Sequence, residues 1–251
     1  MRELLEAVAA GEVSPADAEA RLAGYATDEA GRFDAARERR RGVPEAILGD
    51  GKTPAEAASL AATAVETAGR AIVTRTDPDQ RRAIRDRLGE AHPDADVTVR
   101  DRSGVVVAHG PTFEPPSLDA TVGIVTAGTS DAVPAGEAAA IAAEMGATVE
   151  RIDDVGVAAL TRIVDQLEAL RATDALVVAA GREGALPTVV AGLVDTPVIG
   201  LPVSTGYGHG GEGEAALSGM LQSCTVLSTV NVDAGFVAGA QAGLIARAVD
   251  R

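Results

Sequence analysis

The second half of the chain alternates between short apolar runs and longer segments with helical periodicity. Short runs rich in apolar and β-branched residues occupy 121–126, 147–152, 175–179, 197–201 and 227–232, and helical patterns occupy 134–145, 157–171, 186–194, 214–222 and 237–249. Strands that alternate with helices of this length are joined by right-handed crossovers, which produce a parallel sheet covered by helices on both faces. The sequence therefore predicts an α/β domain over residues 117–251.

The first half is less regular, and a proline-rich stretch, PTFEPP at 111–116, separates it from the second. Proline fixes its own backbone and biases the preceding residue away from helix, so this stretch indicates a linker. The expected elements are a helix start at 14–15, a helix over 54–68, a strand at 71–74, a helix over 78–88 and a hairpin over 97–108 with its turn near 103–104. These signals predict a small α+β domain over residues 1–116.

Composition limits the classes of partner. The chain has two tyrosines, three phenylalanines and no tryptophan, so its interior must consist mostly of aliphatic side chains. Its formal net charge is −15 and Lys52 is the only lysine, a composition that repels nucleic acid and anionic membranes and is typical of adaptation to high salt. Residues 1–20 lack the pattern of a signal peptide, and no apolar stretch reaches the roughly 20 residues that span a bilayer. We expect a cytoplasmic protein that binds neither nucleic acid nor membrane.

Four sequence features, three loops and Cys224, are expected at the carboxyl ends of the predicted strands, where open parallel sheets bind ligands. The first contains Gly128, Thr129, Ser130 and Asp131, the second contains Gly181, Arg182, Glu183 and Gly184, and the third (204–214) contains Ser204, Gly206 and His209. The first loop suits a phosphate, but Ser-Asp is also an ordinary helix-capping pair. The residues alone favour the helix cap. The second is equally consistent with a site and with a solvated turn. The third is typical of a flexible lid or of an exposed loop, and for its histidine the exposed loop is favoured.

Cys224 is the only cysteine, so the chain can form no internal disulfide. A lone cysteine is most often a buried, inert small hydrophobe. Cys224 also falls near the C-terminus of an expected helix, where the helix dipole does not stabilise a thiolate. The residues alone therefore favour a buried, unreactive side chain.

Several segments together resemble one family. Three of them resemble the PurE-like domain of aminoimidazole ribonucleotide (AIR) carboxylases and mutases, namely GTSDAVPAGEAA from Gly128, RIDDVGVAALTR from Arg151 and AAGREGALPTVVAGLVDTPVIGLPVSTGYG from Ala179. The segments MLQSC and NVDAGF narrow the resemblance to LarB, the PurE-like enzymes of nickel-pincer cofactor synthesis, and RRRGVPEAILGDGKTPAE from Arg39 resembles the LarB amino-terminal segment. The resemblance covers the chain from about Phe33 onward and implies a flavodoxin-like, three-layer αβα fold for the second domain.

The resemblance also implies an activity. LarB enzymes carboxylate the pyridinium ring of nicotinic acid adenine dinucleotide with carbon dioxide or bicarbonate. They also hydrolyse its phosphoanhydride, which gives pyridinium-3,5-biscarboxylic acid mononucleotide and AMP. A pyridinium ring is too electron-poor to attack carbon dioxide. Addition of a thiolate para to the ring nitrogen creates an enamine whose meta carbon is nucleophilic, which is covalent catalysis.

By the same resemblance, Cys224 is the nucleophile, Glu183 activates water for hydrolysis, and Asp77 is a second catalytic carboxylate. Substrate-binding roles fall on Gly128, Thr129, Ser130, Asp131, Arg162, Gly181, Gly184, Ser204 and Gly206. The resemblance also implies a Mg²⁺ ion on the substrate phosphates, no metal site made by the protein alone, and a homo-oligomer of the kind that PurE-like domains often form as octamers.

The chain departs from the family pattern at two positions. Thr161 replaces a histidine that usually precedes the arginine now at Arg162, and Arg182 stands where a small or apolar residue is commoner. The first departure moves proton transfer to another base such as His209. Two alternatives therefore stay open: a PurE-type carboxylation of aminoimidazole ribonucleotide, and a catalytically silent nucleotide-binding paralogue.

Overall fold

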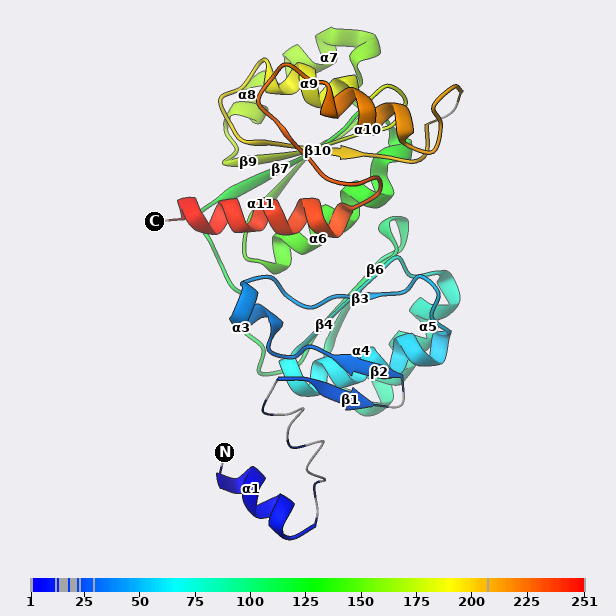
Figure 1. Ribbon diagram of the computed structural model, residues 1–251, viewed down its shortest axis with the longest axis vertical. Coiled ribbons are helices and arrows are strands. Elements are labelled where there is room, and N and C mark those ends of the chain that lie inside the picture. Colours follow the sequence, from blue (N-terminus) through cyan, green and yellow to red (C-terminus); the bar gives the residue numbers. More distant parts are fainter. Residues whose placement is uncertain are drawn as a thin grey trace. The chain divides into compact units, whose positions relative to one another are not determined.

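A computed structural model describes residues 2–11, 13, 18, 22, 24–28, 30–206 and 208–250. The chain forms two compact units, Met1–Glu114 and Pro115–Arg251, which are drawn in blue to teal and in green to red in Figure 1. Their division falls within the proline-rich stretch 111–116. The expected helix start at 14–15 lies outside the described residues.

The first unit is built on a four-stranded mixed sheet with the order β3-β4-β6-β5. Its elements are α1 (Arg2–Ala9), β1 (Ala26–Asp28), β2 (Gly31–Phe33), α3 (Arg37–Arg41), β3 (Ile47–Leu48), α4 (Pro54–Ala68), β4 (Arg70–Thr74), α5 (Pro78–Ala91), β5 (Asp96–Arg100), the 3₁₀ turn η1 (Asp101–Ser103) and β6 (Val105–His109). The expected hairpin is the antiparallel β5–β6 pair. Apolar residues of α4, α5, β4 and β6 form one buried cluster, which confirms the expected α+β fold.

The two expected helix starts that fall among the described residues of this unit are capped as their sequences indicate. Thr53 and Glu56 form a capping box at α4, with a proline at the first turn. At α5, the Asp77 carboxylate accepts hydrogen bonds of 2.8 Å from the backbone amides of Asp79 and Gln80. These contacts satisfy amide groups that have no partner within the helix, so each helix begins at its proline.

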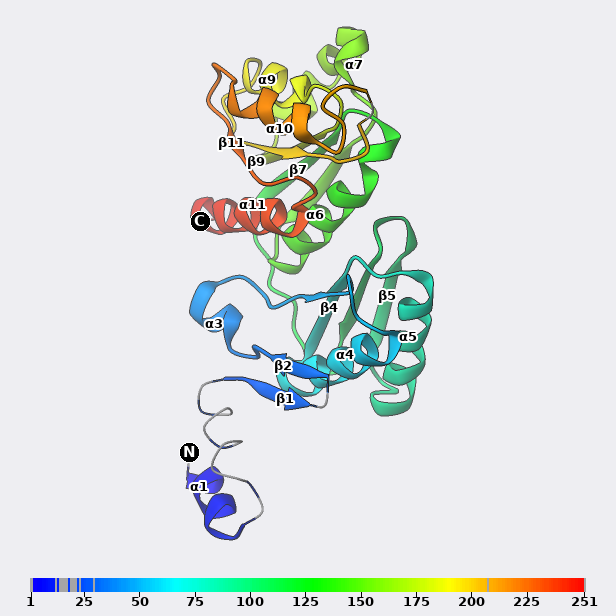
Figure 2. The same cartoon turned by 45° about the vertical axis from the view of Figure 1, so that its right-hand side comes forward.

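The second unit is a five-stranded parallel sheet with the order β11-β10-β9-β7-β8. Its elements are β7 (Thr121–Thr126), η2 (Thr129–Asp131), α6 (Ala132–Glu144), β8 (Thr148–Ile152), η3 (Val157–Ala159), α7 (Leu160–Asp165), α8 (Leu167–Arg171), β9 (Ala175–Ala180), α9 (Ala185–Ala191), β10 (Val198–Pro202), α10 (Glu214–Leu221), β11 (Ser228–Thr229) and α11 (Gly235–Val249). Figure 2 shows α6 and α11 on one face of the sheet and α7, α9 and α10 on the other. This strand order is the flavodoxin-like one, and the expected three-layer αβα fold is confirmed.

Small residues let the helices of this unit pack closely, which is how a chain with few aromatic residues fills its core. Alanines of α6 and α11 pack against Val122, Ile124 and Val177 of the sheet. Between the two helices, a Cβ atom added at Gly239 would lie 2.4 Å from the carbonyl oxygen of Ala138. The helices therefore touch through their backbones at this point.

Two predicted boundaries in this unit are wrong. The single helix expected over 157–171 is three short pieces, because the backbone leaves helical geometry at Ala159 (φ −138°, ψ 87°) and again at Gln166 (φ −101°, ψ 7°). The strand expected at 227–232 has only two residues in regular pairing. Beyond them, the backbone amides of Val230 and Asp233 still donate hydrogen bonds to the β10 carbonyls of Gly200 and Pro202. Among the described residues, no helix is both long enough and apolar enough to cross a membrane.

Candidate active site

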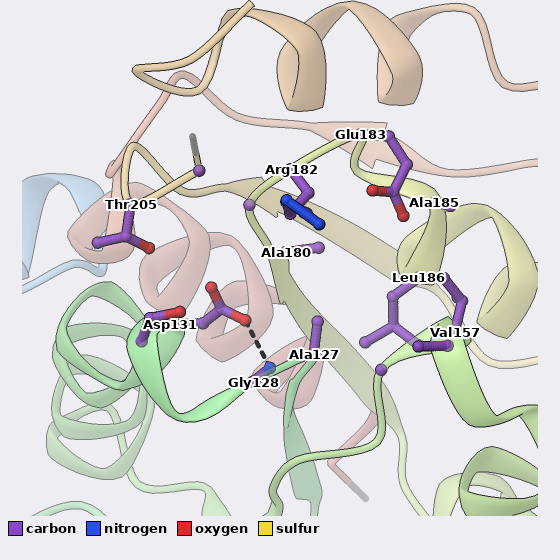
Figure 3. Close-up of a pocket in the computed structure, with 15 residues that line it drawn as sticks. Ala127, Gly128, Asp131, Val157, Ala180, Arg182, Glu183, Ala185, Leu186 and Thr205 are labelled. Atoms are coloured by element: carbon purple, nitrogen blue, oxygen red, sulfur yellow. Dashed lines mark hydrogen bonds between the residues drawn. The ribbon is translucent and has the colours of Figure 1, made fainter. Parts of the chain in front are cut away.

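The strand order reverses between β7 and β9, because the chain leaves β7 for β8 and then crosses back to β9. The loops after β7 and β9 therefore diverge and open a crevice at the carboxyl ends of the strands. A cavity of about 480 Å³ occupies this crevice (Figure 3), within the size range of small-molecule sites. The lining residues are Ala127, Gly128, Ser130, Asp131, Gly156, Val157, Ala158, Ala180, Gly181, Arg182, Glu183, Ala185, Leu186, Thr205 and Gly206.

Asp131 joins the loop after β7 to the loop after β9. Its side chain is only 2% exposed, and its Oδ2 accepts a 2.8 Å hydrogen bond from the amide of Gly128 (Figure 3). Burial raises the pKa of Asp131 above its ordinary value, while hydrogen bonds from the amides of Gly128, Ala127 and Gly181 act in the opposite direction. A carboxylate held in this way can accept a hydrogen bond from a ligand hydroxyl, or act as a base.

The turn after β9 is locked by close backbone contacts. The Gly184 amide donates a 2.8 Å hydrogen bond to the Gly181 carbonyl. Gly184 has a φ of +66°, and a Cβ atom there would lie 2.5 Å from the carbonyl oxygen of Ala216 in α10. On the other side, a Cβ atom at Gly206 would lie 2.7 Å from the backbone nitrogen of Arg182. Glycines therefore allow α10 and the loop after β10 to hold this turn from two sides.

The turn presents two exposed side chains of opposite charge, Arg182 and Glu183, to the cavity. Figure 3 shows the Arg182 guanidinium between the carboxylates of Glu183 and Asp131 in this view. Val157 and Leu186 lie together at another part of the lining and supply an apolar surface (Figure 3). The cavity thus combines a buried carboxylate, two exposed side chains of opposite charge and an apolar surface on which a flat ring could pack.

The structure brings half of the sequence-predicted site residues together. Those that line the cavity are Gly128, Ser130, Asp131, Gly181, Glu183 and Gly206. Thr129, Gly184 and Ser204 belong to the same loops but are not among the described lining residues. Gly184 packs on α10, and the Ser204 amide donates a 3.0 Å hydrogen bond to Asp233.

Three further predicted residues are not among the lining residues of this cavity. Arg162 in α7 is exposed and forms an ion pair of 3.1 Å with Asp154. Asp77 caps α5 in the first unit. Cys224 is exposed, so the interpretation of it as a buried small hydrophobe is wrong. The thiol is exposed because α10 ends at Leu221, before the cysteine can reach a packed helix face.

The expected position of Cys224 at the carboxyl ends of the strands is also wrong, because it lies at the opposite end of the strands from the cavity of its own copy. It precedes β11, which runs parallel to β10 with Ser228 opposite Ile199. Residues that precede a strand lie at the amino ends of a parallel sheet, whereas the cavity lies at the carboxyl ends. In Figure 1 the segment between α10 and β11 lies at the end of the sheet away from the loop after β10. One copy of the chain therefore does not bring Cys224 to the cavity.

Sequence reasoning missed Thr205, Val157 and Leu186 as lining residues. The last two fall within stretches with ordinary helical patterns, and their apolar side chains resemble core residues. Their positions just after predicted strands were the available signal, since those positions face the crevice of an open sheet.

Comparison with known proteins agrees with this geometry. Residues 25–101 match the LarB/PurE-like N-terminal domain, and residues 121–250 match the AIR carboxylase domain. The chain is also 34% identical, over 98% of its length and 97% of the relative's, to the uncharacterized protein MJ0165 of Methanocaldococcus jannaschii. The chain therefore belongs to the LarB/PurE-like, AIR carboxylase-like family.

Proposed function

We propose that this carboxylase-family protein carboxylates the pyridinium ring of nicotinic acid adenine dinucleotide and hydrolyses its phosphoanhydride. The observation that carries the proposal is the cavity at the β7–β9 switch point, where Glu183 and the 128–131 loop meet. The match of residues 25–101 to the LarB/PurE-like N-terminal domain favours this reaction over a PurE-type reaction. We further propose a cytoplasmic homo-oligomer.

Substrate binding would use the two kinds of surface in the cavity. The pyridinium ring packs against Val157 and Leu186, while a ribose hydroxyl donates a hydrogen bond to Asp131. The backbone and hydroxyl groups of the 128–131 loop approach a phosphate. Burial of the flat ring between apolar side chains also excludes water from the reacting carbon.

Carboxylation would begin when the Cys224 thiolate adds to the ring carbon para to nitrogen, which forms a C–S bond and a neutral dihydropyridine. The meta carbon then attacks carbon dioxide and forms a C–C bond. A base removes the proton from that carbon, and the thiolate leaves as aromaticity returns. No oxidant or reductant is needed, since the net change replaces a ring proton with a carboxylate.

The thiol would come from a second copy of the chain. Cys224 is exposed, and the residues around it, Leu221 and Val226, are 67% and 94% exposed in a single copy. Apolar side chains at this exposure favour burial against a partner. Seating this segment at the cavity mouth of another copy would supply the nucleophile that the cavity lacks among its lining residues.

The remaining steps would use the cavity carboxylates. Thr161 is an exposed residue of α7, His209 is exposed in the loop before α10, and neither is among the lining residues. The ring proton therefore goes to Asp131, and Glu183 activates water for attack on the phosphoanhydride. Mg²⁺ would be carried by the substrate phosphates, with the Glu183 carboxylate of the cavity lining as a protein contact. Such an ion would neutralise charge on the phosphate oxygens.

The experiment that tests the proposal separates the two half-reactions. Cys224→Ala and Glu183→Gln are incubated with the dinucleotide, bicarbonate and Mg²⁺ in high salt, and mass spectrometry follows all small molecules. Cys224→Ala should still release AMP but add no carboxyl group, whereas Glu183→Gln should accumulate carboxylated dinucleotide. Loss of both products in both variants would contradict these assigned roles, and binding without turnover by the wild type would favour a silent paralogue.

A further inference from the structure

Arg182 has a backbone conformation that is unfavourable for an arginine. Its φ is +41°, in the left-handed region, where a side chain with a Cβ atom is strained and glycine is not. The residue lies in the turn that the Gly181–Gly184 hydrogen bond closes. A glycine at position 182 would form this turn without strain. Strain of this kind persists where surrounding contacts hold the backbone in the unfavourable conformation, and it is characteristic of functional sites.

The strained position holds the only cation among the described residues that line the cavity. The other two ionisable lining residues are carboxylic acids, Asp131 and Glu183, and the whole chain has a formal net charge of −15. An anionic ligand would therefore meet repulsion in this cavity if Arg182 were absent. A guanidinium can offset that repulsion and can donate two parallel hydrogen bonds to a phosphate or a carboxylate.

We propose that Arg182 determines ligand specificity in this cavity by binding an anionic oxygen group, phosphate or carboxylate, of the ligand. Only the identity of the ligand rests on the proposed function. The competing interpretation is that Arg182 serves as an internal counter-ion to Asp131 and Glu183. The two interpretations predict opposite effects of an Arg182 substitution on the melting temperature.

The test is Arg182→Gly, with equilibrium binding of nicotinic acid adenine dinucleotide measured by calorimetry well below the melting temperature. Glycine relieves the strain, so the variant should melt at a higher temperature than the wild type. Its affinity should fall at least about tenfold, because hydrogen bonds to a charged group are lost. Arg182→Lys should keep part of the affinity, since a lysine retains the charge but not the planar pair of donors.

Arg75→Gly is the matched control. Arg75 also has a positive φ, 55°, but lies in the first unit and is not among the lining residues. This substitution removes the same charge and the same kind of strain, so it reports any effect of net charge alone. Its affinity for the dinucleotide should stay within about twofold of the wild type.

Two further ligands identify the group that Arg182 contacts. If it contacts the ring carboxylate, nicotinamide adenine dinucleotide, which has an amide there, should lose little affinity in Arg182→Gly. If it contacts a phosphate, both dinucleotides should lose affinity equally. An affinity for nicotinic acid adenine dinucleotide that changes less than tenfold, or a melting temperature that falls, would overturn the inference.

Failure of the proposed function is distinguishable from failure of this inference. If the wild type binds no dinucleotide, the proposed function fails, and inorganic phosphate becomes the probe. Stabilisation of the wild type by phosphate, with none in Arg182→Gly, would still support an anion site at Arg182. An equal response, or no response in either protein, would overturn it.

Discussion

Replacing Gly184 with alanine should both strain the cavity turn and force it away from α10. Gly184 has a φ of +66°, and left-handed geometry costs an L-residue about 1–2 kcal/mol. The new Cβ atom would also lie 2.5, 2.8 and 3.0 Å from three backbone atoms of Ala216. Overpacking of this kind costs about 1–3 kcal/mol, so the free energy of unfolding should fall by roughly 2–5 kcal/mol.

Gly51→Ala separates the two contributions. Gly51 has a similar φ of +74°, but nothing lies within 4 Å of a Cβ atom there. Only the strain of about 1–2 kcal/mol should appear in this variant. Urea unfolding followed by circular dichroism measures both free energies, with separate fits where the two units unfold separately. If Gly184→Ala costs no more than Gly51→Ala, then α10 does not hold the turn and the account of the cavity wall is wrong.

Three other predictions concern the cavity and the cysteine. Burial raises the pKa of Asp131 from its ordinary 3.8, so the stability that its protonated form contributes is present below about pH 4 and lost as pH rises through the folded-state pKa. The melting temperature of Asp131→Asn minus that of the wild type should therefore be more positive at pH 7 than at pH 4. A difference that does not change with pH would contradict the raised pKa. Cys224 is exposed in a single copy, so iodoacetamide should modify it without denaturant in the dissociated protein and more slowly in the assembled one, and equal rates would contradict a shared site. Cys224→Ala should change the free energy of unfolding of one copy by less than about 0.5 kcal/mol. Val226 is 94% exposed, so Val226→Arg should leave the fold of each copy intact while light scattering shows loss of the oligomer and carboxylation stops; an unchanged, active assembly would contradict a shared site.

The architecture was predictable because strand and helix periodicities differ so clearly in the second half. The loops at 128–131 and 181–184 could be placed at the carboxyl edge once the strands were assigned, since parallel strands bring those loops to one side of the sheet. The strand β3 was not predicted and β11 was predicted too long, because each has only two residues in regular pairing and so short a sequence gives too few positions for a pattern. Their pairing depends on neighbouring strands that are distant in sequence.

The state of Cys224 was not predictable from local sequence. Its apolar neighbours indicate a core segment, yet the structure leaves Cys224, Leu221 and Val226 exposed. Burial depends on where α10 ends and on which surfaces meet in an assembly, and neither is contained in a local pattern. The contribution of Arg182 was also hidden, because its significance comes from a positive φ beside two carboxylic acids.

The measurement that tests the central claim most directly is transfer of labelled carbon to the ring by the wild type. The protein is incubated with Mg²⁺ and ¹³C-bicarbonate, with nicotinic acid adenine dinucleotide and aminoimidazole ribonucleotide supplied in separate reactions. The account predicts one labelled carboxyl group on each pyridinium mononucleotide and an equal amount of AMP, with no label in the aminoimidazole. Label in the aminoimidazole alone, or AMP released without any labelled ring, would contradict it.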